Sequence, residues 1–185
     1  PTTSVAINWN QIFVFLGIGS YIYTEVLSRF LGKHVAYTVT AVNHPNTATT
    51  EVVMLAKGKP IRHAHAGQFL FVRFKGEKGL DEAHPFTISS APHEGELRVT
   101  VKAVGDFTRH LFQTLKPGTD ALVEGAYGLF NYKTGGDKQI WVAGGIGITP
   151  FLSFLRDLKT DLAFNVHFYY TVRHPEEAVF ADEIE

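Results

Sequence analysis

Short runs of alternating apolar and polar residues limit what this chain can fold into. Leu97, Val99 and Val101 alternate with Arg98 and Thr100, the period-two pattern of a strand with one face in water. Turn-forming Gly and Pro residues separate six runs of this kind, which together favour a small closed antiparallel barrel. The predicted strands are Val35–Val42, Thr50–Ala56, Gln68–Phe74, Phe86–Ser90, Leu97–Ala103 and Ala121–Glu124.

The pattern changes beyond about residue 138. Gln139–Ala143 reads as a buried strand, Phe151–Lys159 as an amphipathic helix and Phe164–Thr171 as a second strand. This order predicts the opening βαβ unit of a doubly wound nucleotide-binding domain. Such domains usually continue for several more strands, so we expect this one to be partial.

Composition excludes several classes of function. The net charge is −1, with Lys and Arg spread along 185 residues, so the chain has no electrostatic footprint for nucleic acid. It contains no Cys, which excludes disulfides, thiolate catalysis and iron–sulfur ligation within this sequence. With 45% hydrophobic residues, it has enough apolar material for a globular core.

The N-terminal segment, residues 1–34, is apolar and aromatic and ends in the basic residues Arg29 and Lys33. It approaches the roughly 20 apolar residues that a membrane-spanning helix needs, but polar residues such as Asn10 and Gln11 interrupt it. Two interpretations stay open: the last transmembrane helix of a larger membrane protein, or a hydrophobic helix packed on a soluble domain. The sequence opens without an initiating Met, and we expect a fragment or processed chain.

A glycine-rich turn, Gly144–Pro150, joins the predicted strand to the helix near the C-terminus. Its glycines let backbone N–H groups approach a pyrophosphate, and a helix N-terminus favours an anion. Thr149 could cap the helix or bond a phosphate oxygen, and Pro150 suits the first turn. The alternative is a tight strand–helix connection, but the strand-before, helix-after context favours a ligand.

Arg173 follows the second strand at the point where dinucleotide-binding domains usually carry an acidic residue for a ribose hydroxyl. An Arg there could accommodate a 2′-phosphate and would favour NADPH over NADH. The alternative is a surface Arg paired with Glu176 or Glu177.

Two further stretches combine unusual residues. Gly105 and Thr108 flank the start of the predicted helix Phe107–Leu115, which suits either a phosphate group or a plain helix cap by Asp106 or Thr108. In the stretch His84–Ser90, the ring of Phe86 and the hydroxyl of Thr87 could contact a flat heterocycle, and His84 could donate a hydrogen bond to it or to a phosphate. Taken alone, that stretch could equally be a buried strand with a satisfied His.

These motifs, in this order, resemble the ferredoxin–NADP reductase superfamily, and most of all the FAD-binding FR-type domain of its ferric reductase and NADPH oxidase branch. The motifs are His84-Pro85-Phe86-Thr87, Gly105-Asp106-Phe107-Thr108, Glu124-Gly125-Ala126-Tyr127-Gly128 and Gly144-Gly145-Ile146-Gly147-Ile148-Thr149-Pro150. The resemblance covers about residues 33–183. Ala126 replaces a Pro usual in the family, and the family's C-terminal Cys-Gly-Pro region is absent.

The resemblance implies a set of site residues. Phe86 would lie beside the flavin, and Thr87 would hydrogen-bond near its N5 and is the candidate catalytic residue. The other implied cofactor-binding residues are His84 and Pro85 for FAD, the backbone of Val101, Lys102 and Ala103 beside the flavin, Gly105 and Thr108 for the FAD pyrophosphate, Gly145, Gly147 and Thr149 for the NADPH pyrophosphate, and Arg173. No metal ligands are expected; His63 and His65 read as a solvated turn.

The resemblance also implies an organisation and an activity. We expect a mainly β fold: a hydrophobic helix in residues 1–34 that ends a transmembrane domain, an FAD-binding barrel in 35–133 and a partial NADPH-binding α/β domain in 138–185. The expected function is the dehydrogenase portion of a membrane ferric reductase or NADPH oxidase-like protein. Electrons would pass from NADPH through FAD to haem in an upstream membrane domain, and then to ferric ion or oxygen, with barrel and nucleotide domain in the cytoplasm. The alternatives are a soluble flavin reductase serving an oxygenase or ferredoxin, and a non-catalytic barrel module.

Overall fold

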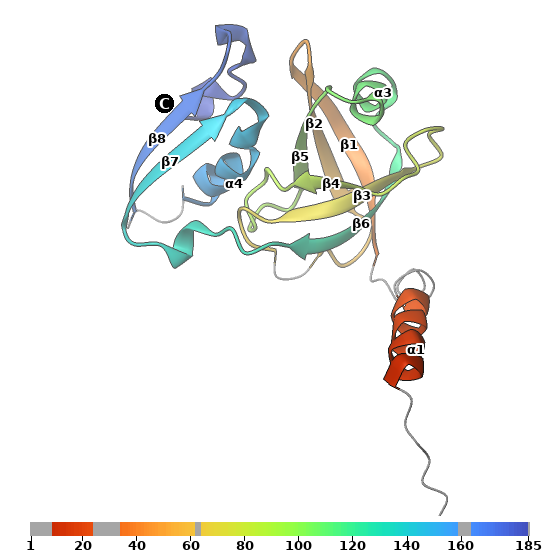
Figure 1. Ribbon diagram of the computed structural model, residues 1–185. Coiled ribbons are helices and arrows are strands. Elements are labelled where there is room, and N and C mark those ends of the chain that lie inside the picture. Colours follow the sequence, from red (N-terminus) through yellow and green to blue (C-terminus); the bar gives the residue numbers. More distant parts are fainter. Residues whose placement is uncertain (1–8, 24–33, 62–63, 159–163, 185) are drawn as a thin grey trace, which may run out of the picture. The chain divides into compact units, whose positions relative to one another are not determined.

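A computed structural model of the chain describes residues 9–23, 34–61, 64–158 and 164–184 (Figure 1). The chain divides into two units, residues 1–33 and 34–185. The first contains helix α1, Trp9–Ile22, whose large apolar side chains, such as Phe13 and Phe15, are exposed. Arg29 and Lys33, predicted to end the N-terminal segment, lie outside the described residues. Among the helices that the structure describes, none has both the length and the hydropathy needed to cross a bilayer.

A six-stranded antiparallel sheet forms the larger part of the second unit. The strands follow one another in the order β4-β3-β6-β1-β2-β5, and a bridge between Ile88 and Val99 joins the two edges. The predicted antiparallel six-stranded sheet is therefore confirmed, and we call it the barrel. Its strands are β1 Val35–Asn46, β2 Thr49–Ala56, β3 Phe69–Lys75, β4 His84–Thr87, β5 Leu97–Lys102 and β6 Asp120–Tyr127.

The barrel core follows from the alternation in the sequence. Leu70, Val72 and Phe74 of β3 have no exposed surface, whereas the residues between them are partly exposed. They pack with Val52 of β2 and Val99 of β5 in one hydrophobic cluster. Period-two patterning thus delivers one buried face to the core.

Several predicted strand boundaries are wrong: β4 is His84–Thr87 where Phe86–Ser90 was predicted, and β6 is Asp120–Tyr127 where Ala121–Glu124 was predicted. His44–Asn46 reads as a turn in the sequence, yet β1 continues to Asn46, which pairs with Thr49. The pairing register shifts between Asn43 and Asn46. This irregularity accommodates Pro45, which cannot donate a ladder hydrogen bond. The β1–β2 hairpin is longer than the turn chemistry suggested.

Helix α3, Asp106–Thr114, follows β5 and buries Leu111 in the barrel core. The helix was predicted over Phe107–Leu115, and its position is confirmed to within one residue. Leu115 ends it in an extended conformation, before Pro117 and Gly118.

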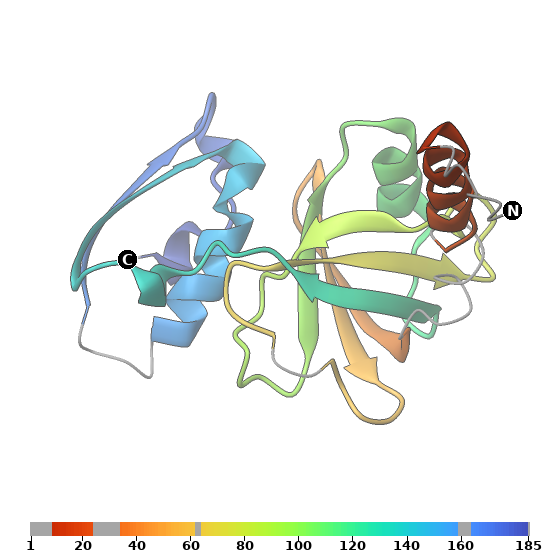
Figure 2. The ribbon, with the colours of Figure 1, turned by 60° about the horizontal axis from the view of Figure 1, so that its bottom comes forward.

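The remaining elements form a parallel βαβ unit. Strand β7, Lys138–Gly144, pairs in parallel with β8, Asn165–Thr171, and a 3₁₀ turn, η3 Gly145–Ile148, leads into helix α4, Thr149–Leu158. The predicted strand–turn–helix–strand order is confirmed. Helix α4 lies between this two-stranded sheet and the barrel (Figures 1 and 2). Short 3₁₀ turns occur at η2 Tyr132–Thr134, η4 Pro175–Glu177 and η5 Ala181–Glu183.

A second hydrophobic cluster joins α4 to one face of this sheet. Trp141 of β7, Phe168 of β8 and Phe151 and Phe154 of α4 pack together with their ring centroids 5.1–6.1 Å apart. The other face of β7 is exposed, with Ile140 72% accessible to solvent.

Candidate functional site

Strand β4 carries the predicted flavin-contact residues at the edge of the sheet. An edge strand keeps part of its backbone free of the ladder, which also explains how Pro85 is tolerated there. The His84 ring packs against Phe107 at the start of α3, with ring centroids 3.6 Å apart and the ring planes tilted by 32°. Phe86 lies near the same ring, at 6.4 Å. Phe107 therefore connects the two motifs that the sequence left separate.

The His84 side chain has an unsatisfied polar atom. Its Nε2 is buried and has no hydrogen-bond partner among the residues that the structure describes. The carboxylate of Glu82 lies 3.7 Å away, beyond hydrogen-bonding distance. A buried polar group without a partner costs free energy. A ligand oxygen beside β4 would remove that cost once the His84 or Phe107 ring turned to expose Nε2.

Gly105 occupies the N-cap of α3 in an extended conformation, where either Asp106 or Thr108 was predicted. The Thr108 hydroxyl accepts hydrogen bonds from the backbone N–H groups of Val104 and Gly105, both at 3.0 Å, and lies 3.1 Å from the Gly105 carbonyl. Thr108 thus orders the turn itself. A Cβ on Gly105 would meet no atom within 4 Å, so the helix N-terminus is open to an anion.

A cleft of about 700 Å³ lies beside the carboxyl ends of β5, β7 and β8. Four of the predicted site residues line it: Lys102, Ala103, Gly145 and Arg173. Arg109 of α3 and Glu177 also line it. The cleft therefore brings cationic groups from the barrel and from the βαβ unit to one place.

Lys102 and Glu177 join the two sides of this cleft through an ion pair of 2.9 Å. The hydrogen bond from Lys102 lowers the pKa of the Glu177 carboxyl, and the charges of Lys102, His174 and Arg173 add to the effect. Within the part of the chain that the structure describes, Arg173 forms no ion pair with Glu176 or Glu177. The exposed Arg173 guanidinium is thus available to an anion in the cleft.

The glycine-rich turn is open where a pyrophosphate was predicted. A Cβ on Gly145 or on Gly147 would meet nothing within 4 Å, and Gly145 has a φ of +50°. Thr149 begins α4 but is only 6% exposed. Gly147 and Thr149 are not among the residues lining the cleft. Of the predicted NADPH-binding residues, Gly145 and Arg173 therefore line the cleft, whereas Gly147, just before α4, and Thr149, at its start, lie outside the lining.

Val101 is buried in the barrel core, so its side chain faces away from solvent. Three residues at the candidate site were not among the predicted site residues: Phe107, Arg109 and Glu177. Phe107 stood inside a motif already singled out, and its aromatic ring was the available signal. Glu177 reaches Lys102 across 75 residues of chain, and no local pattern predicts that contact.

No group of three or more His, Asp or Glu side chains gathers to hold a metal in the described ranges. His63, half of the pair interpreted as a solvated turn, lies outside those ranges. The residues near β4 and α3 fit FAD in their chemistry: an unpartnered imidazole nitrogen, aromatic rings and an open helix N-terminus.

The chain is similar in sequence to a known protein family and to several curated proteins. Residues 34–129 match the family described as FAD-binding domain. Mouse NADPH oxidase 1 is 30% identical over 91% of this chain, which spans 30% of that protein's length. The carnitine monooxygenase reductase subunit of Escherichia coli is 31% identical over 69% of the chain and 40% of its own length.

A solved structure supports the fold. The flavohem-like FAD/NAD-binding domain of nitric oxide dioxygenase from Vibrio cholerae superposes with a TM-score of 0.72 at 22% identity. The alignment covers 81% of this chain and 67% of that one.

Proposed function

Because the chain belongs to the FAD-binding domain family, we propose that residues 35–133 bind FAD and residues 138–185 bind the NADPH that reduces it. The single observation that carries this proposal is the buried, unpartnered Nε2 of His84 beside the open N-terminus of α3. Such a pair suits the phosphate or ribityl oxygens of a flavin nucleotide.

Each residue has a role that follows from its chemistry. His84, packed against Phe107, donates to an FAD oxygen. Phe86 offers an apolar surface to the ring, and the Thr87 hydroxyl donates a hydrogen bond to it. Gly105 leaves room for the pyrophosphate. When bound, FAD supplies two-electron acceptance from a nicotinamide and release of single electrons, chemistry that no side chain here provides.

The cleft between barrel and βαβ unit serves the nicotinamide nucleotide. Gly145 and Gly147 let backbone groups approach its pyrophosphate, and Arg173 pairs with the 2′-phosphate that distinguishes NADPH from NADH. Lys102 adds a second positive charge once a phosphate competes with Glu177 for it. Thr149 stabilises the turn from its buried position at the start of α4.

We also propose that the chain is the dehydrogenase portion of an NADPH oxidase-like or ferric reductase-like membrane protein. The similarity to mouse NADPH oxidase 1 over nearly the whole chain supports this proposal. The exposed aromatic and aliphatic side chains of α1 are compatible with a lipid environment. Electrons would then leave towards haem in an upstream membrane domain, and finally to ferric ion or oxygen, with residues 35–185 on the cytoplasmic side.

A soluble reductase that serves an oxygenase is the second candidate. The similarity to the carnitine monooxygenase reductase subunit supports it. The two candidates share the FAD and NADPH sites and differ in membrane attachment and in the electron acceptor.

An absorbance titration tests the shared proposal. Purified protein is mixed with FAD, freed of unbound flavin by gel filtration, and then exposed to NADPH without oxygen. We expect the flavin bands to be retained and then bleached. Loss of flavin on the column contradicts the FAD site, and retention without bleaching contradicts hydride transfer by this chain.

Substitution of Arg173 tests the choice of nucleotide. Arg173→Ala should weaken NADPH binding about tenfold, because a charge-assisted hydrogen bond is lost, and should leave NADH binding unchanged. Isothermal titration with each nucleotide measures both constants. Lys138→Ala, at the opposite end of β7, is the matched control and should change neither. Equal weakening of both nucleotides by Arg173→Ala excludes the 2′-phosphate role.

A further inference from the structure

Helix α4 holds the segment that follows β4. The Ser89 carbonyl accepts a hydrogen bond from Arg156 Nη1 at 2.8 Å, and the Ser90 carbonyl accepts one from the Ser153 hydroxyl at 2.6 Å. Ser153 and Arg156 are three residues apart and so lie on the same face of the helix. Two consecutive carbonyls, immediately beyond Thr87 and Ile88, are therefore both bound by one helix.

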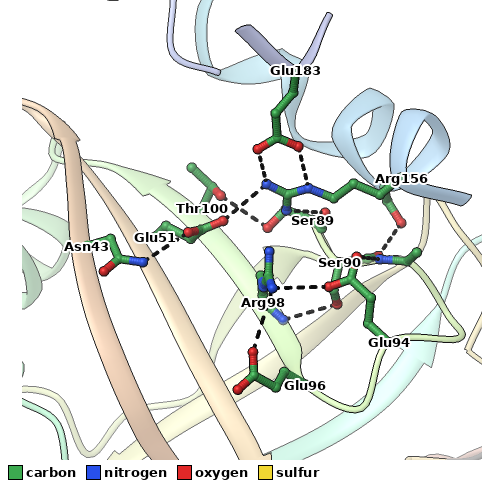
Figure 3. A network of polar contacts seen from close by, with 12 residues as sticks. Asn43, Glu51, Ser89, Ser90, Glu94, Glu96, Arg98, Thr100, Arg156 and Glu183 are labelled. Atoms are coloured by element: carbon green, nitrogen blue, oxygen red, sulfur yellow. Dashed lines mark hydrogen bonds and ion pairs between the residues drawn. The ribbon is translucent and has the colours of Figure 1, made fainter. Parts of the chain in front are cut away.

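The Arg156 guanidinium joins four segments of the chain (Figure 3). Besides Ser89, its Nε and Nη2 donate to the two carboxylate oxygens of Glu183 at 2.8 and 2.7 Å. Nη2 also lies 3.3 Å from Glu51 Oε1 on β2, and Asn43 Nδ2 donates to the other oxygen of Glu51. The side chain is 5% exposed. Burial alone would lower the pKa of Arg156, but Glu183 and Glu51 raise it above its ordinary value.

The segment held by Arg156 is also fixed to β5. The Ser89 N–H donates to the Arg98 carbonyl at 2.8 Å, and the Thr100 hydroxyl donates to Ser89 Oγ at 3.1 Å. The Arg98 N–H donates to Ser90 Oγ at 3.1 Å. A shift of α4 against the barrel would therefore displace the end of β4 or break these bonds.

We propose that Arg156 is a positioning residue that sets the register between Thr87 on the barrel and the glycine-rich turn at the start of α4. This inference rests on the proposed function, in which the flavin lies at the first place and the nicotinamide nucleotide at the second. Arg156 lies seven residues after Thr149, about 10 Å along the helix. Hydride transfer requires the reacting atoms to approach to about 3–3.5 Å, and a displacement of about 1 Å can cost about 100-fold in rate.

The chemistry of the contact supports positioning over simple adhesion. Buried ion pairs often stabilise a fold no better than apolar contacts, because the charges must be desolvated. Their hydrogen bonds are directional, however, and an arrangement shifted by one residue would take the Arg156 donors away from Glu51 Oε1 and the Ser89 carbonyl. The aromatic cluster on the other side of α4 has no such requirement.

Distance measurement between the two parts tests the register directly. The chain has no Cys, so Lys116→Cys and His167→Cys place spin labels on exposed positions of the barrel and of β8. The test variant combines Arg156→Met with Glu51→Gln, which avoids leaving Glu51 buried without its cation. We expect one narrow distance distribution in the parent and a distribution at least twice as broad in the variant.

Lys133→Met is the matched control. Lys133 forms an ion pair of 2.9 Å with Asp157, the residue next to Arg156 on α4, but does not bridge to the barrel. The control should keep the narrow distribution. Ser153→Ala, which removes one neutral hydrogen bond to the same segment, should broaden the distribution less than the Arg156 variant. An unchanged distribution in the Arg156 variant overturns the proposal.

Reduction kinetics separate a register effect from loss of a cofactor. In the flavin-loaded protein, the Arg156 variant should keep the FAD dissociation constant and its rate of reduction by dithionite, which needs no nucleotide site. Reduction by NADPH should slow about 100-fold. Equal slowing by both reductants overturns the positioning role. A parent that binds no FAD, or is not bleached by NADPH, contradicts the proposed function instead, and the distance distribution then decides the register by itself.

Discussion

Helices α3 and α4 begin in the same way but differ in how much of each helix is buried. Each follows a strand through a glycine-containing turn, and each turn leaves open space beside a glycine where an anion can approach. Yet α3 buries only Leu111, whereas seven residues of α4 are buried, including the polar Ser153, Arg156 and Asp157. One candidate anion site lies on the surface of the barrel, and the other lies at the start of the helix that packs between the barrel and the two-stranded sheet. Substitutions in the body of α4 should therefore cost more stability than substitutions in the body of α3.

Truncation of an aromatic residue on each helix should show the largest difference between α3 and α4, in the free energy of unfolding. Phe154→Ala on α4 should lower the free energy of unfolding by about 3–5 kcal/mol, because Phe154 is 1% exposed and packs against Trp141 and Tyr132. Phe112→Ala on α3 should cost about 1 kcal/mol, since Phe112 is partly exposed and its ring packs against His44. Urea unfolding measures both. Equal losses would falsify the contrast.

Substitution of one glycine in each turn should separate the two cofactors. Gly105→Ala should weaken FAD binding, and Gly147→Ala should weaken NADPH binding, each by about 1–3 kcal/mol because the new methyl group fills space meant for a phosphate. Neither should change the free energy of unfolding by more than about 0.5 kcal/mol, since the Cβ meets no protein atom. Flavin fluorescence and calorimetry give the two affinities. If either variant weakens the binding of FAD and the binding of NADPH equally, the assignment of one turn to each cofactor is wrong.

Thr87→Val removes a hydroxyl from β4 with little change in volume. The loss of one hydrogen bond of about 1 kcal/mol should slow flavin reduction by NADPH roughly fivefold. FAD affinity should change by less than twofold, because the main FAD contacts are proposed to come from His84 and the turn at Gly105. Stopped-flow absorbance at the flavin band measures the rate, and Thr114→Val on α3 is the control. An unchanged rate removes Thr87 from the chemistry.

The smallest effect concerns acid stability on the α4 side. Burial alone would raise the pKa of the Asp157 carboxyl, but hydrogen bonds from Lys133 and Tyr132 outweigh it and hold the pKa below its ordinary value. A carboxyl with a lowered folded-state pKa adds stability above its unfolded pKa, and that stability is lost as pH falls through the folded pKa. Lys133→Met should therefore cost at most about 1 kcal/mol at pH 7, since Lys133 is half exposed.

The role of the Lys133 charge is tested by measuring how the stability lost in Lys133→Met depends on pH. The difference between parent and Lys133→Met should shrink as pH falls from about 5 to about 3, where Asp157 becomes protonated in the variant first. Denaturant midpoints at both pH values measure it. A difference that is constant with pH shows that Lys133 acts through packing instead of charge.

The sequence alone determined the six antiparallel strands, the helix after β5 and the βαβ order, because each depends on local periodicity and turn chemistry. It also identified the motifs of both candidate sites, since glycines at helix starts and an aromatic–hydroxyl strand are local signals. It erred at the bounds of β4 and at His44–Asn46, where pairing of β1 with β2 overrode the turn preference of Pro45.

Only the tertiary structure decided how the motifs combine. The packing of His84 against Phe107, the ion pair of Lys102 with Glu177 and the four-way contact of Arg156 join residues 23 to 105 positions apart. Such contacts depend on closure of the barrel and on docking of α4 against it, and period-two or helical patterns carry no information about them. The sequence identified the motifs of two candidate nucleotide sites, and the packing of one helix between two sheets set the distance between them.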